Sequence, residues 1–249
     1  MKRILVIGET CLDVFVYGSA DRLCPEAPVP VFRENKSIEC AGMASNVYRN
    51  VIECVGDLNE VGTVNIVTND QKGSKVRYID SSSNHMFLRV DSDTYEEIKK
   101  VDLTTANIRS YDAVIVSDYD KGFLTDRDLC YIGERAKLSF IDTKKEYNPR
   151  WGKLFDFIKI NKKEYTENGF KNLGLKNLIV TLGSEGCKFR GKKFPLKMAS
   201  QVRDVSGAGD TFLAAFACSY LYYGSADLAI DYAQSCCSIV VGKAGTATI

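Results

Sequence analysis

The spacing of apolar positions divides the chain into two regions that differ in predicted secondary structure. From residue 111 onward, short apolar runs end in polar residues, as in YDAVIVSD (111–118), and segments with helical spacing, such as 126–138, separate them. Further runs of this kind cover residues 138–143, 155–160 and 176–183. Alternation of strands and helices predicts βαβ units and a parallel sheet that helices cover on both faces.

The N-terminal region has shorter and more alternating runs. KRILVIGE (2–9) ends its apolar stretch at a glycine, which is typical of a buried first strand. Residues 29–40 and 75–91 alternate apolar and polar side chains and predict half-exposed antiparallel strands, with a hairpin loop at 81–84. Between these segments, MASNVYRNVIECVG (43–56) has the apolar spacing of a helix.

The C-terminal region predicts two long apolar helices between Gly207 and Gly242, separated at Tyr223–Gly224–Ser225. The first, which contains TFLAAFACSYLYY, is expected to be amphipathic.

A short segment before these helices looks like a phosphate-binding loop but fails as one. GCKFRGKK (186–193) matches G-x-x-x-x-G-K, yet Lys193 stands where Ser or Thr is required, and Pro195 disfavours a helix start. We expect a hairpin between Cys187–Phe189 and Lys193–Leu196 instead.

Composition adds few constraints. The 249 residues, 45% hydrophobic and 26% charged, suit one large domain. The formal net charge of +1 provides no global field to attract nucleic acid or a membrane surface, and no run of 18 apolar residues predicts a membrane span. Any anion site must therefore be local.

The nine cysteines and the single histidine exclude several kinds of site. The cysteine count is odd, the spacing is irregular and no Cys-x-x-Cys occurs, so small buried side chains in a reducing cytoplasm are expected. His85 alone argues against a zinc site and against a Ser-His-Asp triad.

Candidate chemistry gathers at predicted strand ends and at one glycine motif. Four strands end in Asp118, Asp142, Asn161 and Thr181. This edge of a parallel sheet is where ligands bind. In VSGAGDTF, Gly207-Ala208-Gly209 precedes a helix, so free N–H groups and the helix dipole favour an anion there. Phe212 breaks the dinucleotide-binding fingerprint.

Asp210 has two interpretations. An acid in the first helical turn can simply stabilise the helix, but beside an anion site it can also take a proton from an attacking hydroxyl. The second combination is what phosphoryl transfer requires. CAGMASN (40–46), which opens the other helix, is likewise either a helix start with small residues for packing or part of a site.

DVSGAGDTF resembles the signature of the ribokinase-like (PfkB) carbohydrate kinases. The resemblance implies an α/β fold: a doubly wound, mostly parallel sheet with helices on both faces and a small β-strand lid. Residues 1–249 would form a single kinase domain whose lid strands come from about 14–40 and 75–91.

The family's landmarks imply roles for particular residues. Asp210 is the base, and Gly207, Ala208 and Gly209 stabilise the transferred phosphoryl group. The sugar side comprises Asp13, Gly42, Asn46, Asp118, Lys121 and Arg89, with Lys75 and Arg77 as further basic candidates. The side for ATP comprises Asn161, Glu164, Thr181, Gly183, Gly186, Lys144 and Gln234. Glu164 is expected to reach Mg²⁺ through water.

Within this family, PEAPVP (25–30), SDYDKG (117–122) and VVGKAGT (240–246) resemble segments of the heptose-7-phosphate kinases. This implies phosphorylation of the C1 hydroxyl of D-glycero-D-manno-heptose 7-phosphate to the 1,7-bisphosphate, in ADP-heptose biosynthesis for lipopolysaccharide. It also implies a homodimer formed through the lid. PEAPVP could otherwise be a linker or a recognition peptide; we expect a rigid, extended approach to the lid beside the sugar site.

Several departures leave alternatives open. The segment VGTVNIVTNDQKGSKVRY (61–78) is shorter than the family's, DTKK (142–145) replaces D-P-K-G, and Gln234 stands where Asn is usual. The alternatives are a kinase for another sugar, sugar phosphate or nucleoside, and a catalytically silent binding protein. The intact Asp210, Asn161 and Glu164 argue against the silent protein.

Overall fold

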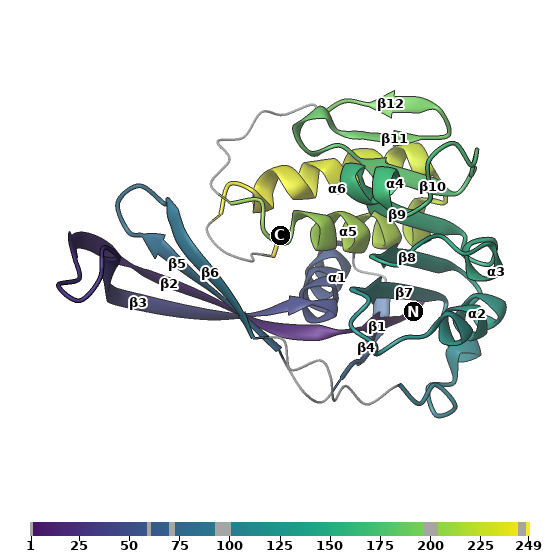
Figure 1. The fold of residues 1–249 in the computed structure, drawn as a ribbon. Helices are drawn as coiled ribbons and strands as arrows, with labels where there is room; N and C mark the ends of the chain where they lie inside the picture. Colours follow the sequence, from purple (N-terminus) through teal and green to yellow (C-terminus); the bar gives the residue numbers. More distant parts are fainter. Residues whose placement is uncertain (1, 59–60, 70–72, 93–100, 197–203, 244–247) are drawn as a thin grey trace.

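An eight-stranded sheet forms the centre of the protein, and a four-stranded sheet projects from one side of it as a separate arm (Figure 1). The computed structural model describes residues 2–58, 61–69, 73–92, 101–196, 204–243 and 248–249. The C-terminal segment VVGKAGT therefore lies partly outside the described residues.

The central sheet is parallel except at one edge. Its strands are β1 (Lys2–Gly8), β4 (Val61–Val67), β7 (Ala113–Asp118), β8 (Ser139–Thr143), β9 (Phe157–Asn161), β10 (Leu178–Thr181), β11 (Cys187–Phe189) and β12 (Lys192–Phe194). They lie in the order β12-β11-β10-β9-β8-β7-β1-β4. β11 and β12 pair antiparallel as a hairpin. The mostly parallel sheet and this hairpin confirm the prediction.

Helices cover both faces of the sheet, as predicted. One face carries α1 (Ala44–Leu58), α5 (Ala208–Tyr223) and α6 (Ala226–Val240); the other carries α2 (Asp126–Arg135) and α3 (Pro149–Gly152), while α4 (Lys162–Glu167) follows β9. Short 3₁₀ turns cover Ile108–Ser110 and Gly183–Glu185. In β1, Ile4 and Val6 face the first layer and Leu5 and Ile7 the second, because successive strand residues point to opposite faces.

Helix α5 differs from the expected amphipathic helix. Every residue from Asp210 to Ser219 is buried. The helix lies between the sheet and helices α1 and α6, so it has no solvent face along most of its length. A helix that is enclosed on all sides is apolar all round, which explains why its sequence is so rich in Ala, Phe and Leu.

The arm is a second sheet of four strands, which we call the lid. Its strands are β2 (Thr10–Leu23), β3 (Pro30–Met43), β5 (Gly73–Asp80) and β6 (Met86–Ser92), in the order β3-β2-β5-β6. Only Glu9 separates β1 from β2, so the central sheet leads directly into the lid. Residues 68–72 connect β4 to β5 in the sequence.

The proline-rich segment does not lie where we expected it. Residues 24–29 form the exposed turn between β2 and β3, at the end of the lid farthest from the central sheet, and Pro30 begins β3. None of them lines the pocket described below. The position suits proline, because β3 is an edge strand and a turn has no ladder hydrogen bonds to lose.

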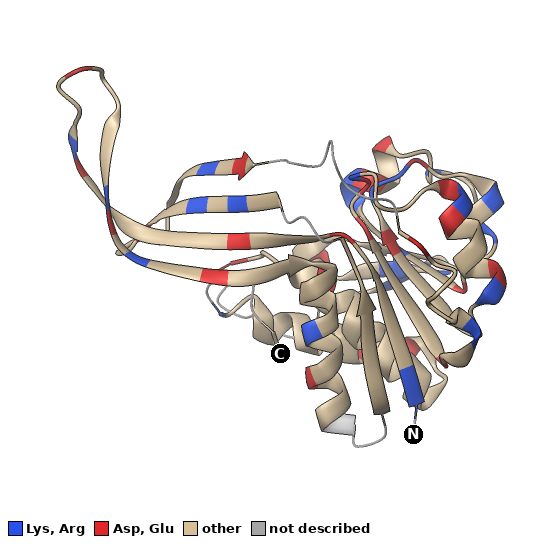
Figure 2. Cartoon of the chain, turned by 90° about the horizontal axis from the view of Figure 1, so that it is seen from below, with Lys and Arg blue, Asp and Glu red and all other residues tan. Residues whose placement is uncertain are grey.

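The distribution of charged side chains and the state of the cysteines agree with what the sequence indicated. Lys and Arg are interspersed with Asp and Glu along both the lid and the body (Figure 2). All nine cysteines are free thiols, and five of them are buried. No helix among the described residues has the length and hydropathy needed to cross a bilayer.

Phe216 of α5 is 1% exposed and lies in the core between this helix and the sheet. Its ring contacts the rings of Phe140, Phe157 and Tyr220. We predict that Phe216→Ala lowers the free energy of unfolding by about 3–5 kcal/mol, because it removes a ring and leaves a cavity. Tyr222→Ala, at an exposed position of the same helix, should change it by about 1 kcal/mol or less. Urea unfolding of both variants tests this, and equal losses would contradict it.

Candidate active site

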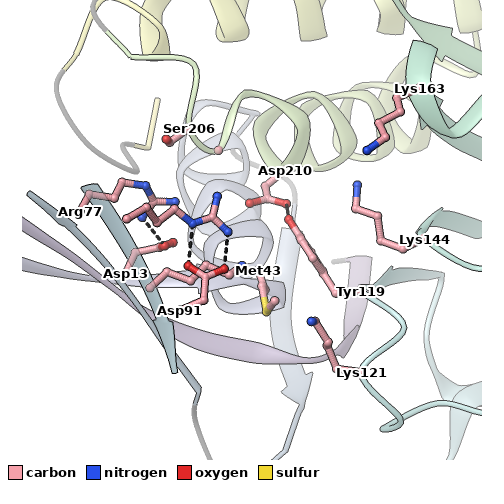
Figure 3. Close-up of a pocket in the computed structure, with 13 residues that line it drawn as sticks. Asp13, Met43, Arg77, Asp91, Tyr119, Lys121, Lys144, Lys163, Ser206 and Asp210 are labelled. Carbon is pink, nitrogen blue, oxygen red and sulfur yellow. Dashed lines mark hydrogen bonds and ion pairs between the residues drawn. The ribbon is translucent and has the colours of Figure 1, made fainter. Parts of the chain in front are cut away.

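A pocket of about 670 Å³ lies between the lid and the carboxyl edge of the central sheet (Figure 3). The lid and its junction with α1 contribute Asp13, Met43, Lys75, Arg77, Arg89 and Asp91. The body contributes Tyr119, Lys121, Lys144, Lys163, Ser206, Gly207 and Asp210. Tyr119, Lys144 and Lys163 follow the ends of three neighbouring strands, β7, β8 and β9, so ligand-facing side chains gather at the edge that the sequence indicated.

The pocket is basic although the whole chain is nearly neutral. Six Lys and Arg side chains line it, against three Asp side chains. Within the lid, Arg77 pairs with Asp13 at 2.7 Å and Arg89 with Asp91 at 2.6 Å. The remaining cations come from both sides of the pocket, so its net charge favours an anionic ligand, as expected for a local anion site.

Asp210, the predicted base, is 5% exposed in the first turn of α5. Asn46 Nδ2 donates to its Oδ2 at 3.0 Å, and the Tyr119 hydroxyl donates to its Oδ1 at 3.0 Å. Burial raises the pKa of Asp210 to about 6, against the lowering effect of the Asn46 hydrogen bond. The group is therefore charged at neutral pH and takes up a proton in mild acid.

The turn before Asp210 has the backbone of an anion site. Gly207 has φ 80°, a left-handed conformation that favours glycine. A Cβ on Gly209 would lie 2.9 Å from the ammonium nitrogen of Lys159, so a side chain there would displace this cation. Because the first N–H groups of a helix lack helical partners, a phosphate can approach them over the two glycines.

Beneath this turn lies a buried ion pair. The Lys159 ammonium is 2.5 Å from Asp142 Oδ2, and both residues are more than nine-tenths buried. Burial alone would lower the pKa of Lys159, but the Asp142, Glu164 and Asp210 carboxylates outweigh it, and the net pKa lies above its usual value. Asp142 Oδ1 has no hydrogen-bond partner among the described residues. Lys159 is thus a permanent positive charge beside the anion site.

A buried carboxylate holds the loop after β7. Glu9, which is 0% exposed, accepts hydrogen bonds from the backbone N–H groups of Tyr119 (2.9 Å) and Lys121 (3.0 Å). Asp118 does not line the pocket; it is 1% exposed and accepts from the Thr143 hydroxyl at 2.6 Å. Burial, followed by the charge of Glu9, raises the pKa of Asp118 to about 7.

The other predicted sugar-side residues meet near Asp13. A Cβ on Gly42 would lie 2.2 Å from Asp13 Oδ2, so glycine is required for this carboxylate to keep its place. Lys121 and Arg89 line the pocket with Asp13. Asn46 is fully buried behind Asp210, where it contacts the predicted base and Asn50.

The predicted ATP-side residues divide into two groups. Lys144 lines the pocket and pairs with Glu164. Glu164 and Asn161 form the capping box of α4, and each carboxylate oxygen of Glu164 accepts from Asn161 at 2.7 Å. Neither of these two residues lines the pocket, and nor do the other four. Thr181 donates to Ile160, Gly183 and Gly186 form a turn with positive φ, and Gln234 donates to the Phe194 carbonyl.

Sequence reasoning missed Tyr119, Lys159 and Glu9 as parts of the site. Tyr119 stands inside the quoted segment SDYDKG, and Lys159 is a charged residue inside the apolar run FDFIKI. A lysine within a buried strand needs an acidic partner, which is the signal that could have identified it. Lys163, Asp91 and Ser206 were also missed.

The sheet, the lid and the acid-bearing helix have the arrangement that the resemblance to ribokinase-like kinases implied. A sequence model described as pfkB family carbohydrate kinase matches residues 157–249, the part that contains Asp210. The C-terminal part of the chain is thus similar to the pfkB family of carbohydrate kinases.

Curated relatives align with nearly the whole chain. The bifunctional protein HldE of Nitratiruptor sp. is 32% identical over 296 residues, which cover 99% of this chain and 63% of the relative. The HldE protein of Hyphomonas neptunium is 31% identical, and the alignment covers 100% of this chain and 62% of that protein. The chain thus spans less than two thirds of these relatives. An alignment of 296 residues against a chain of 249 means that the relative has stretches that this chain lacks.

Solved structures share the fold. The ribokinase of Thermotoga maritima superposes with a TM-score of 0.68 at 16% identity, over 99% of this chain and 95% of that one. The Arabidopsis thaliana ribokinase, solved with ribose and ATP, gives 0.67 at 18% identity, with coverage of 98% and 94%. The ribokinase-like fold expected from the sequence is therefore confirmed.

The Lys159–Asp142 pair provides a test of the site's electrostatics. We predict that Lys159→Met lowers the free energy of unfolding by about 3–5 kcal/mol, because it leaves the Asp142 carboxylate buried and unpaired. Adding Asp142→Asn to that variant should recover most of the loss. Urea unfolding of the two single variants and the double variant measures the coupling. Additive losses would show that the two charges do not stabilise each other.

Proposed function

We propose that residues 1–249 form one ATP-dependent sugar kinase domain, with the lid closing over the acceptor. The observation that carries this proposal is the placement of Asp210. A buried carboxylate that is charged at neutral pH stands at the start of a helix, beside a glycine turn and a basic pocket. A base next to an anion site is the arrangement that phosphoryl transfer needs.

In this proposal, each group has a separate task. Asp210 accepts the proton of the attacking hydroxyl as the bond to phosphorus forms. The backbone of Gly207, Ala208 and Gly209, with the Lys159 ammonium behind it, stabilises charge on the transferred phosphoryl group. Asp13 and Arg77 shape the acceptor side. Alignment of the two substrates supplies most of the rate, since phosphoryl transfer needs little covalent help.

ATP and Mg²⁺ fit the residues present. Arabidopsis ribokinase was solved with ATP and the Cryptococcus neoformans enzyme with ADP, which supports a nucleotide here. Lys144 and Lys163 would face its phosphates. Because Asn161 and Lys144 already occupy both oxygens of Glu164, this carboxylate would hold Mg²⁺ through water. The ion would neutralise phosphate charge. The remaining predicted ATP residues, Thr181, Gly183, Gly186 and Gln234, stay a prediction.

The proposed acceptor is the C1 hydroxyl of D-glycero-D-manno-heptose 7-phosphate, giving the 1,7-bisphosphate for ADP-heptose biosynthesis. PEAPVP and SDYDKG support it, as does the similarity to part of the HldE proteins over nearly the whole of this chain. A sugar that already carries phosphate needs cations away from the reacting hydroxyl. Lys75, Arg89 and Lys121 supply them on the acceptor side. The nine free cysteines support a reducing compartment such as the cytoplasm.

The direct test incubates the protein with ATP, Mg²⁺ and heptose 7-phosphate and detects the bisphosphate by mass spectrometry. We predict turnover by the wild type. Asp210→Asn should reduce kcat by about 10²–10⁴-fold while nucleotide binding, measured by calorimetry, persists, since it removes the base and keeps the shape. Ribose, fructose 6-phosphate and adenosine serve as control acceptors.

Three results would contradict this proposal. Faster turnover of a control acceptor would reassign the substrate. Near-normal kcat in Asp210→Asn would show that Asp210 is not the base. Binding of ATP and heptose 7-phosphate without any product would indicate a silent binding protein.

We also propose a homodimer formed through the lid. Four apolar side chains of the edge strand β6 are exposed: Met86 (46%), Phe87 (41%), Leu88 (55%) and Val90 (41%). Leu88 and Val90 alternate with Arg89 and Asp91, so they lie on the face of the lid opposite to the pocket. They continue an apolar surface with Val76 and Tyr78, their partners on β5. A second copy of the same surface would cover them.

Leu88→Asp tests the dimer. The change should shift the protein from dimer to monomer in light scattering coupled to size exclusion, because it places a charge in an apolar interface. The matched control is Leu228→Asp, whose side chain is equally exposed (53%) on α6, away from the lid. A monomeric wild type, or the same behaviour of both variants, would contradict the lid interface.

A further inference from the structure

We propose that Tyr119 is a positioning residue for Asp210, and that its hydroxyl holds this carboxylate in the charged, oriented form that accepts the proton of the acceptor. The inference rests on the proposed function, in which Asp210 is the base. Tyr119 would act through Asp210 and not on the transferred phosphoryl group.

The contact geometry defines the direction of the hydrogen bond. The Tyr119 oxygen lies 3.0 Å from Asp210 Oδ1, while Asn46 donates to Oδ2 from the other side at 3.0 Å. Burial and the charge of Asp210 raise the pKa of Tyr119 well above its usual value, so the phenol keeps its proton and donates it. An ionised carboxylate oxygen accepts more than one hydrogen bond, which leaves capacity for the acceptor hydroxyl.

Tyr119 is held at both its backbone and its ring. Its N–H group donates to the buried carboxylate of Glu9 at 2.9 Å. Two cations lie over the ring: Lys75 Nζ, from the lid, is 5.1 Å from the ring centre, and Lys144 Nζ, from the segment after β8, is 5.4 Å away. These contacts hold the ring in place where it lines the pocket beside Asp210 (Figure 3).

The charged groups around Asp210 come from several elements. Burial is the largest influence and raises its pKa; Asp142 on β8 acts in the same direction, and Lys159 on β9 acts against it. Cys11 on β2 also lies within electrostatic range, with a thiol whose pKa is raised to about 11, so it stays neutral. The hydrogen bonds from Asn46 and Tyr119 lower the pKa of Asp210.

Removal of the Tyr119 hydroxyl changes the pKa of Asp210 in a defined direction. Hydrogen bonds to the charged form of an acid favour that form, so loss of the phenol hydroxyl raises the pKa of Asp210 above its present value of about 6. The base is active when deprotonated. The acid limb of the pH–rate profile must therefore move to higher pH when Tyr119 loses its hydroxyl.

The test variant is Tyr119→Phe, which keeps the ring and removes only the donor. With ATP and heptose 7-phosphate, the acid limb of kcat/KM should move up by about one pH unit, with about a fivefold loss at pH 6, about a tenfold loss at pH 5 and little loss above pH 8. The matched control is Tyr147→Phe, because the Tyr147 hydroxyl is buried with no partner among the described residues and lies outside the pocket. Its profile should equal that of the wild type.

A second measurement does not depend on turnover. The ¹³C resonance of the Asp210 carboxyl, assigned by its absence in Asp210→Asn, should titrate at higher pH in ligand-free Tyr119→Phe than in the wild type. A wild type without turnover would contradict the proposed kinase function alone. An unmoved Asp210 titration, or a loss of kcat/KM that is uniform across pH, would overturn the positioning role of Tyr119.

Discussion

The site depends on one constraint: a carboxylate, Asp210, must stay charged although it is almost fully buried. Burial of an acid raises its pKa, and the value of about 6 means that the surrounding groups offset only part of this effect. The compensation comes from three elements. Helix α1 supplies Asn46, the loop after β7 supplies Tyr119, and β9 supplies the Lys159 ammonium. These elements must be packed together before the buried Asp210 carboxylate can stay charged at neutral pH.

The same constraint explains the distribution of charge in the chain. Its formal net charge is only +1, yet six cationic side chains surround the pocket. Buried acids balance two of them, Arg77 and Lys144, and also balance Lys159 behind the glycine turn. Asp142 faces Lys159, and Glu164 faces Lys144, so the positive charge beside the glycine turn is held in place before a phosphate arrives. Glu9 extends this arrangement to the backbone, because it joins the start of the lid to the loop that carries Tyr119 and Lys121. Preorganised charge of this kind requires no rearrangement during reaction.

Patterns of neighbouring residues predicted the strands and the start of α5, because these features depend mainly on residues that are close in the sequence. Apolar runs located β7 to β10 and the strand-end residue Asp118, and the glycine motif located the start of α5. Roles that depend on contacts between distant residues were not predictable. Glu9 and Tyr119 are 110 residues apart, and nothing near Lys159 in the sequence identifies Asp142 as its partner. The placement of PEAPVP failed for the same reason: prolines indicate a rigid turn, but only the length of β2 carries that turn to the far end of the lid.

Strand β4 belongs to the segment that is shorter than the family resemblance implies, and it lies away from the residues that line the pocket. Strand β4 is the edge of the central sheet, it pairs only with β1 among the described strands, and no residue of β4 lines the pocket. The pocket is built from the lid and from segments that follow β7, β8 and β9 on the other side of β1. Asp210 and its partners therefore do not depend on a helix between β4 and β5. The substituted segment DTKK has more influence on the site. Its Lys144 pairs with Glu164, and its Lys145 lies beside Asp118 and Asp120, so these two lysines set the charge around the loop that positions Tyr119.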